Sequence, residues 1–184
     1  QFAHIQQQSF IAATIDAQAR ALPFSSYYGW STSSPPRMGA ALTSDSSLHL
    51  VGTTPGSLFP AVAAAQSTFG GGTGDGAYVR CDFADIHLQA TLVNFGRVPV
   101  GSVNPQTIKV TNKGRAPLIL RNLGVLPPAY TSPASFPISV APGASVSIPF
   151  VFTPPTAGAY KGTVTLFTDD VDEETIVISL KGDA

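Results

Sequence analysis

The stretch SVSIPFVFTPPTAGAYKGTVTLFTDDVDEETIVISL, residues 145–180, decides the fold of the second half of the chain. It contains three runs in which apolar and small polar residues alternate, and Pro, Gly or Asp residues separate the runs. Because successive side chains of a strand point to opposite faces, alternation with a period of two indicates half-buried strands. The stretch therefore predicts three strands, with Ile148, Phe150 and Phe152 on one buried face.

Similar runs from residue 86 onward bring the predicted total to seven short strands, each closed by a turn residue. Seven short strands in about 100 residues are typical of a β-sandwich. The single cysteine, Cys81, excludes an internal disulfide, so apolar packing has to stabilise this sandwich. The expected core comprises Val146, Ile148, Phe150, Phe152, Val164, Leu166, Ile176, Ile178 and Leu180, with Ile108, Val110, Leu118 and Leu120 opposite them.

A weak internal repeat marks the first half of the chain. SFIAATID, residues 9–16, aligns with AYVRCDF, residues 77–83, and between them lie the aromatic run ALPFSSYYGW and the hairpin-like MGAALTSDSSLHLVG, residues 38–52. Such a period is the sequence signature of a repeated β unit. We therefore predict an all-β fold class with two domains, residues 1–85 and 86–184.

The glycine-rich segment STFGGGTGDGAYVRCDF, residues 67–83, has two interpretations. A phosphate-binding loop needs glycines between a strand and a following helix, so that backbone amides and the helix N-terminus face the anion. Here a strand-like run follows the glycines, and the Lys-Ser/Thr pair of such loops is missing. A joint between strands, in which Gly70 to Gly76 provide backbone freedom, is therefore the favoured interpretation.

Two family resemblances extend these expectations. FIAATID, PFSSYYGW, LTSDSSLHLVGTT and SLFPAVAAAQSTFGGGTGDG, within residues 9–83, resemble the bacterial seven-bladed β-propeller repeat (SBBP), although WSTSSPPR replaces its glycines after the aromatic strand. VNFGRVPVGS, KVTNKGRAPLIL, PGASVSIPFVFTPPTAGAYKGTVTLFTDD and ISLKG, within residues 88–183, resemble the ASH/Hydin-type (choice-of-anchor D) immunoglobulin-like domain. The resemblances imply a propeller-blade-like antiparallel sheet followed by an immunoglobulin-like β-sandwich. They also imply a secreted or cell-surface protein, and no catalytic residue to carry over.

Composition excludes several classes of protein. Charged residues make up 11% of the chain and the net charge is −1, so no basic patch is expected to bind nucleic acid. No apolar run approaches the roughly 18 residues that a membrane helix needs, so membrane insertion is not expected. The start, QFAHIQQQSF, lacks the basic and apolar segments of a signal peptide, and a processed form and a fragment of a longer protein both stay open.

Residues with catalytic or metal-binding chemistry are scattered. His4, His49 and His87 are not spaced as metal ligands, and no hydrolase signature occurs. Cys81 occupies the repeat position that Ala13 fills in the first copy, which favours a small buried thiol over a nucleophile. We therefore expect neither an enzyme nor a cofactor or tightly bound metal.

Two segments are candidate binding sites. The acidic run TDDVDEET, residues 168–175, is interpreted as an exposed hairpin turn, and a weak extracellular calcium site is the alternative. The calcium ligands would be Asp169, Asp170 and Asp172. An aromatic group could stack on sugars or pack between blades, and we take it as a candidate interaction surface; it comprises Phe24, Tyr27, Tyr28 and Trp30.

The function expected from these features is that of a non-catalytic structural or adhesive module of a bacterial secreted or cell-surface protein. A lone blade covers neither face of its sheet, so protein partners or copies of the chain itself are expected to cover it, in a filament, a surface layer or a larger propeller. The alternative is a carbohydrate- or protein-binding module appended to a secreted enzyme, with a glycan as possible ligand. The sequence leaves the identity of the partner and the oligomeric state open.

Overall fold

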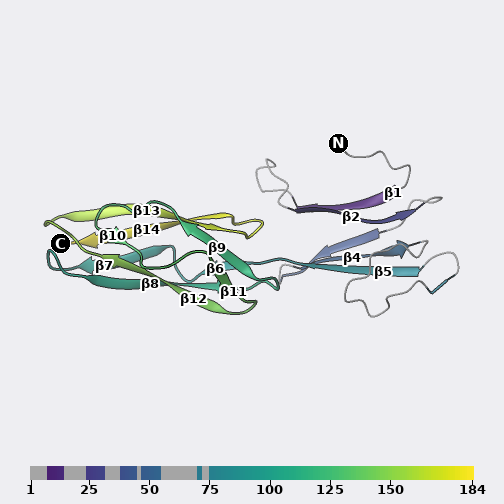
Figure 1. The fold of residues 1–184 in the computed structure, drawn as a ribbon, viewed down its shortest axis with the longest axis horizontal. Helices are drawn as coiled ribbons and strands as arrows, with labels where there is room; N and C mark the ends of the chain where they lie inside the picture. Colours follow the sequence, from purple (N-terminus) through teal and green to yellow (C-terminus); the bar gives the residue numbers. More distant parts are fainter. Residues whose placement is uncertain (1–7, 15–23, 32–37, 45–46, 55–69, 72–74) are drawn as a thin grey trace. The chain divides into compact units, whose positions relative to one another are not determined.

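The computed structural model describes residues 8–14, 24–31, 38–44, 47–54, 70–71 and 75–184 (Figure 1). These residues form strands and loops, which confirms the all-β prediction. Within these ranges no helix occurs, and hence none that could cross a membrane. The chain divides into two compact units, Gln1–Cys81 and Asp82–Ala184, and each has its own sheets.

The first unit contains a two-stranded and a three-stranded sheet. β1 (Gln8–Thr14) pairs antiparallel with β2 (Phe24–Ser31), while β3 (Met38–Leu42), β4 (Ser47–Thr54) and β5 (Asp75–Asp82) form the other sheet. β3 and β4 are the predicted hairpin, closed where the Thr43 N–H donates to the Ser47 carbonyl (3.0 Å). The five described strands thus belong to two sheets, whereas the sequence suggested one blade.

The glycine-rich segment is described only at residues 70–71 and from residue 75 onward. Gly71 has a φ of 98°, in the region that favours glycine, and the strand β5 follows. A strand at this place agrees with a joint between strands, because a phosphate-binding loop would need the N-terminus of a helix.

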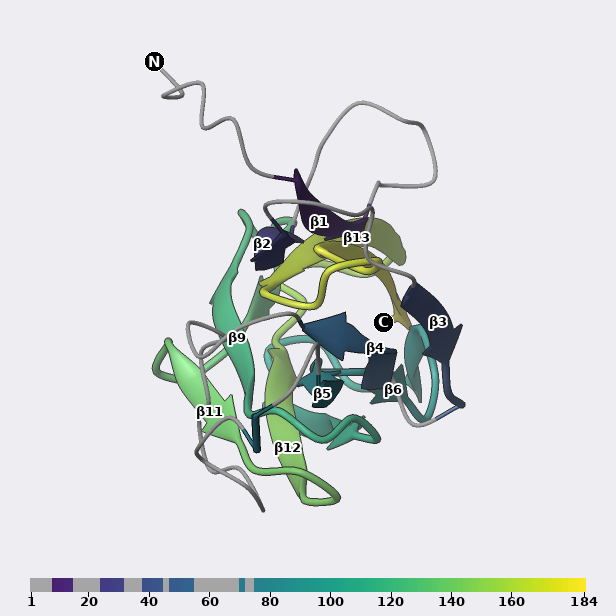
Figure 2. The same ribbon diagram turned by 90° about the vertical axis from the view of Figure 1, so that its right-hand side faces the viewer.

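The second unit is a sandwich of a four-stranded and a five-stranded sheet, which can be followed in Figure 1 and from the side in Figure 2. All seven predicted strands are present, and the sequence missed the short strands β6 and β10. The sheet orders are β10-β12-β8-β6 and β11-β9-β13-β14-β7. The strands are β6 (Ile86–Leu88), β7 (Leu92–Arg97), β8 (Asn104–Asn112), β9 (Leu118–Leu123), β10 (Tyr130–Thr131), β11 (Ile138–Val140), β12 (Ser145–Phe152), β13 (Ala159–Thr168) and β14 (Thr175–Asp183).

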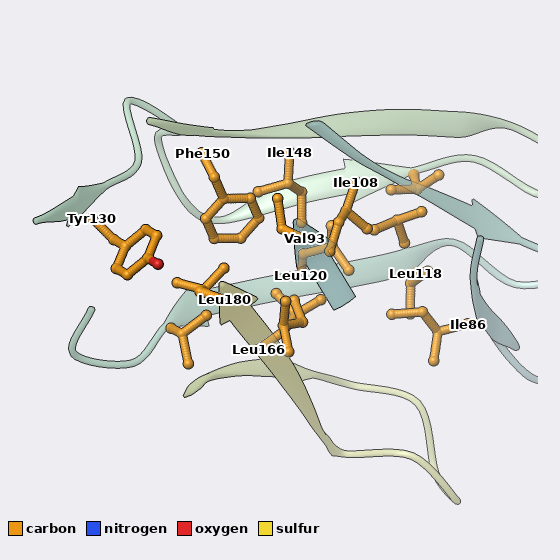
Figure 3. Packing of buried hydrophobic residues seen from close by; sticks show 14 of the residues in the cluster. Ile86, Val93, Ile108, Leu118, Leu120, Tyr130, Ile148, Phe150, Leu166 and Leu180 are labelled. Carbon is orange, nitrogen blue, oxygen red and sulfur yellow. The ribbon is translucent and has the colours of Figure 1, made fainter. Parts of the chain in front are cut away.

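One apolar core fills the space between these two sheets (Figure 3). The predicted core positions are buried, apart from Val146 and Ile176, which are half-buried. Figure 3 shows Ile86 beside Leu118 at one end of the core and Tyr130 at the other end. Alternation therefore identified the buried face of each strand correctly.

The predicted division of this core between the two sheets was wrong. Ile108 and Val110 were expected opposite Ile148, but β8 pairs with β12 in the same sheet and Ile108 is the direct partner of Ile148. The residues that face them belong to β9, β13 and β14. Alternation shows which side chains of a strand share a face, but it carries no information on which strands pair.

An aromatic cluster closes one end of the core. The Phe152 ring stacks on Tyr130 (ring centroids 4.9 Å apart) and contacts Phe95 (5.4 Å) and Tyr160 (5.3 Å). The ring also lies against the backbone of Gly182, where a Cβ atom would come within 2.5 Å of it. Packing of the largest rings therefore requires glycine at residue 182.

We expect Gly182→Ala to destabilise the sandwich, because the new methyl group overlaps the Phe152 ring. Overpacking of this kind costs about 1–3 kcal/mol, which chemical denaturation of the two proteins would measure. Gly124→Ala is the matched control, since its Cβ would meet its nearest neighbour at 3.5 Å, an ordinary contact. Equal losses of stability in the two variants would contradict the role assigned to Gly182.

Candidate functional site

The predicted aromatic surface lies on β2. Tyr27 is the backbone partner of Ile11 and Tyr28 that of Phe10, and the pairing slips between Gln8 and Phe10. The side chains of this strand lie outside the described part of the structure, as does His4. The surface formed by Phe24, Tyr27, Tyr28 and Trp30 therefore stays a prediction.

The other histidines and Cys81 lie on separate strands. His49 is on β4, where its Nδ1 lies 2.7 Å from the hydroxyl of Tyr78 on β5, and His87 is exposed on β6. Cys81 is half-buried, whereas the sequence suggested a buried thiol. Within the described residues, no three His, Cys, Asp or Glu side chains come together in a way that could hold a metal ion.

The acidic run forms the turn between β13 and β14, as predicted, but it is not wholly exposed. Thr168 and Asp170 are buried, with 0% and 1% of their surface exposed. Oδ2 of Asp170 accepts the backbone N–H of Ile86 at 2.6 Å, and its Oδ1 accepts that of Asp172 at 3.2 Å. The prediction of full exposure was wrong, because the Asp170 carboxylate is buried where it accepts hydrogen bonds from the backbone of Ile86 and Asp172.

The same turn also reaches the neighbouring strand β9. Oδ1 of Asp169 accepts the Ile119 N–H (2.7 Å), and the Asp169 N–H donates to the Ile119 carbonyl (3.1 Å). The Thr168 hydroxyl donates to the Glu173 carbonyl (2.9 Å) and accepts the Asp170 N–H (3.0 Å). Since β9 and β6 belong to different sheets, the turn ties the two sheets together at one end of the sandwich.

A second buried polar residue, Asn112, lies at the end of β8. Its side-chain NH₂ donates to the carbonyls of Ala116 (2.8 Å) and Val140 (3.0 Å). Its Oδ1 accepts the N–H of Gly114 (3.0 Å) and that of Asp85 (3.3 Å). Both donors and the acceptor of the amide are thus used on backbone groups.

The chain enters the domain between these two polar centres. The Phe83 carbonyl accepts the N–H groups of Arg115 (3.0 Å) and Ala116 (3.1 Å), and the Asp85 carbonyl accepts that of Lys113 (2.7 Å). Gly114 lies so close that a Cβ atom there would come within 2.6 Å of the Asp85 nitrogen. We call this arrangement the entry clasp; it consists of residues 83–86, 112–116 and 168–170.

The electrostatics of the entry clasp centre on Asp170. Burial, and then a hydrogen bond with the Asp172 side chain, raise the pKa of Asp170 from 3.8 to about 7. The backbone N–H groups of Ile86 and Asp172 act in the opposite direction, because they stabilise the carboxylate. Desolvation therefore outweighs the backbone donors, and the turn changes charge near neutral pH.

The geometry of the acidic turn bears on the calcium alternative. Asp169 and Asp170 each direct one oxygen to a backbone N–H, of Ile119 and Ile86 respectively, and Asp172 is exposed. A calcium ion takes six to eight oxygen ligands, so it would have to compete with these backbone donors. The calcium site at Asp169, Asp170 and Asp172 stays a prediction.

A comparison with protein families identifies the domain that carries the clasp. Residues 84–183, more than half of the chain, match the family described as HYDIN/CFA65/VesB-like, Ig-like domain. The chain belongs to this family. The ASH/Hydin-type resemblance of residues 88–183 is therefore confirmed at the level of this Ig-like family. The propeller resemblance concerns residues 9–83, which precede the matched region, and stays a prediction.

Three solved structures align with parts of this chain. A protein of unknown function from Porphyromonas gingivalis W83 aligns with a TM-score of 0.51 and 17% identity, over 84% of this chain and 69% of the other. The Vibrio cholerae VesB protease aligns with a TM-score of 0.47 and 17% identity, over 54% of this chain. The ASH/PapD-like domain 7 of human CEP192 aligns at 0.45 with 11% identity, over 55% of this chain and 86% of the domain.

The aligned part of VesB is 32% of that chain, so the match covers about a third of the VesB structure. A search of curated protein sequences found no match. At 17% identity, the Porphyromonas gingivalis structure shows a likeness of fold alone.

The sequence carried an overlooked signal for the entry clasp. The inward-facing positions of β8 run Ile108, Val110 and then Asn112. Those of β13 are Val164, Leu166 and Thr168, and the next residue at the same spacing of two is Asp170, in the turn after β13. A polar residue that continues an inward-facing apolar row has to be paired inside the domain. Turn composition alone suggested an exposed turn at residues 168–175 and only a strand-closing residue at Asn112.

We expect Asn112→Ala to lower the free energy of unfolding by roughly 2–4 kcal/mol, because each buried backbone group left unpaired costs about 1–3 kcal/mol. Asn122→Ala is the control, since Asn122 is exposed on β9 and surface changes usually stay within about 0.5 kcal/mol. Urea denaturation measures both values. An Asn112 variant as stable as the Asn122 variant would contradict the structural role assigned to the Asn112 side chain.

Proposed function

We propose that the chain is a non-catalytic interaction module of a secreted or cell-surface protein, in which the Ig-like domain is the scaffold and apolar β surfaces bind other protein chains or further copies of itself. Membership of the HYDIN/CFA65/VesB-like Ig-like family supports the scaffold role. Apolar side chains exposed on the three-stranded sheet support the binding role.

The observation that carries this proposal is the exposed apolar surface of β4 and β5. Tyr78 is 59% exposed and Val51 is 52% exposed. Val51 shares a side of β4 with His49, which contacts Tyr78 of β5, so His49, Val51 and Tyr78 form one surface, called here the β4–β5 surface. Leu42, which is also exposed, pairs with Leu48 and lies on the other side of the sheet. Covering apolar area releases about 25 cal/mol per Å², so a partner that covers this surface gains binding free energy.

The interior of the Ig-like domain supports a scaffold without chemistry of its own. Its buried polar side chains are Asn112, Thr168 and Asp170. Each of them is hydrogen-bonded to backbone groups that hold strands and turns in place. Such residues stabilise one arrangement of the chain, and exposed faces are then left to recognise partners.

A second candidate is a carbohydrate- or protein-binding module appended to a secreted enzyme. The family description includes VesB, whose solved structure is that of a protease, so family members occur beside catalytic domains. In this case the aromatic residues of β2 would contact the ligand. A glycan array separates the candidates: binding that Trp30→Ala abolishes favours the appended module, and an array without binding favours protein assembly.

We expect Val51→Thr to weaken self-association of the full chain several-fold, because the substitution removes an apolar methyl contact while keeping a β-branched side chain. Val125→Thr is the matched control, since Val125 is 94% exposed but belongs to the other unit. Sedimentation velocity over a range of concentrations measures both. A wild-type chain that stays monomeric contradicts self-assembly, and equal effects of the two variants contradict the β4–β5 surface.

A further inference from the structure

The entry clasp joins a titratable group to the segment through which the chain enters the Ig-like domain. Asp170 is 1% exposed, and its Oδ2 holds the N–H of Ile86, the first residue of β6, at 2.6 Å. β6 contains only residues 86–88 and forms the edge of its sheet. β6 also pairs with β8, and residues 112–116 bind the residues before it, so Asp170 adds to these contacts one that can gain or lose a proton.

We propose that the turn at residues 168–172 is a pH-sensitive latch on the entry segment, Phe83–Leu88, closed in mildly acidic solution and loosened in mildly alkaline solution. This segment directly follows the boundary between the two units, which lies at Cys81 and Asp82. Loosening it opens the first strand of the Ig-like domain while the core of the sandwich stays folded. The latch is independent of the partner that the proposed function requires.

The direction follows from linkage. The pKa of Asp170 is raised in the closed state, so the closed state binds the proton more tightly than an open state with a solvated carboxyl group. The resulting stabilisation is fully present below the ordinary pKa of 3.8 and is lost as the pH rises through about 7. The latch therefore loosens progressively as the pH rises to about 7, and a further rise adds little.

Burial of Asp170 sets the sign of the effect, and Asp172 adds to it. In the turn, Asp172 adds a second carboxylate beside Asp170, and Asp169 lies next to it along the chain. Asp85 precedes Ile86 on the entry segment, and the exposed His87 follows it. Lys113 and Arg115 belong to the loop that binds this segment through backbone groups. The pKa of Asp170 is raised by burial and by Asp172, so ionisation favours opening.

One interaction opposes the latch. The N–H of Ile86 binds an ionised carboxylate more strongly than a neutral one, because hydrogen bonds to charged acceptors are stronger. This bond lowers the pKa of Asp170, but burial and Asp172 raise it by more. The closed state therefore favours the form in which Asp170, hydrogen-bonded to Asp172, carries a proton.

Amide hydrogen exchange of the full chain tests the latch. After correction for the intrinsic pH dependence of exchange, protection of the Ile86 amide should fall about tenfold between pH 6 and pH 8, as expected for the loss of one proton with a pKa near 7. The Lys113 and Ala116 amides, which donate to the entry segment, should follow. The Ile148 amide, in the centre of the sandwich, should keep its protection.

Variants distinguish the latch from other titrations. Asp170→Asn should make protection of Ile86 independent of pH, and Asp172→Asn should move the transition to lower pH. Asp169→Asn and His87→Gln should leave the transition in place. Equal protection of Ile86 at pH 6 and pH 8 in the wild type overturns the proposal. So does a transition that survives Asp170→Asn, or one that His87→Gln removes.

Discussion

The need to pair polar groups inside an apolar sandwich governs how the second unit is built. The inward-facing rows of β8 and β13 each end in polar residues, Asn112 on one strand and Thr168 on the other. An unpaired polar group in such a place would cost as much as a large part of the stability of a domain. Backbone of the entry segment and of β11 supplies partners for Asn112, and backbone of the acidic turn supplies those for Thr168, so the apolar core and the polar end form together.

Much of the sandwich could be predicted from the sequence. Period-two alternation located seven strands and the core side chains, because burial of one face constrains every second residue. Strand pairing could not be predicted, because the Ile108 side chain would be buried in the same core whichever of the two sheets its strand joined. β6 and β10 were missed because strands of three and two residues are too short to show a pattern.

The candidate sites were less accessible to sequence reasoning. The acidic run was correctly placed in a hairpin turn, but the burial of Asp170 depends on a backbone N–H that comes 84 residues earlier in the chain. Composition reports the local preference of a turn and not its distant partners. Asn112, likewise, looks like an ordinary turn residue until the parity of its strand is followed inward.

Scaffold and interaction roles fit together in this chain. In the Ig-like domain, polar residues are used to fix the backbone, whereas the three-stranded sheet of the first unit exposes apolar side chains such as Val51 and Tyr78. The segment between them belongs structurally to the Ig-like domain from Phe83 onward. The most direct test of this assignment compares the thermal unfolding of residues 82–184 with that of residues 87–184. We predict a cooperative transition for the longer piece and a much lower or absent transition for the shorter one, and equal melting temperatures would contradict the central role of the entry clasp.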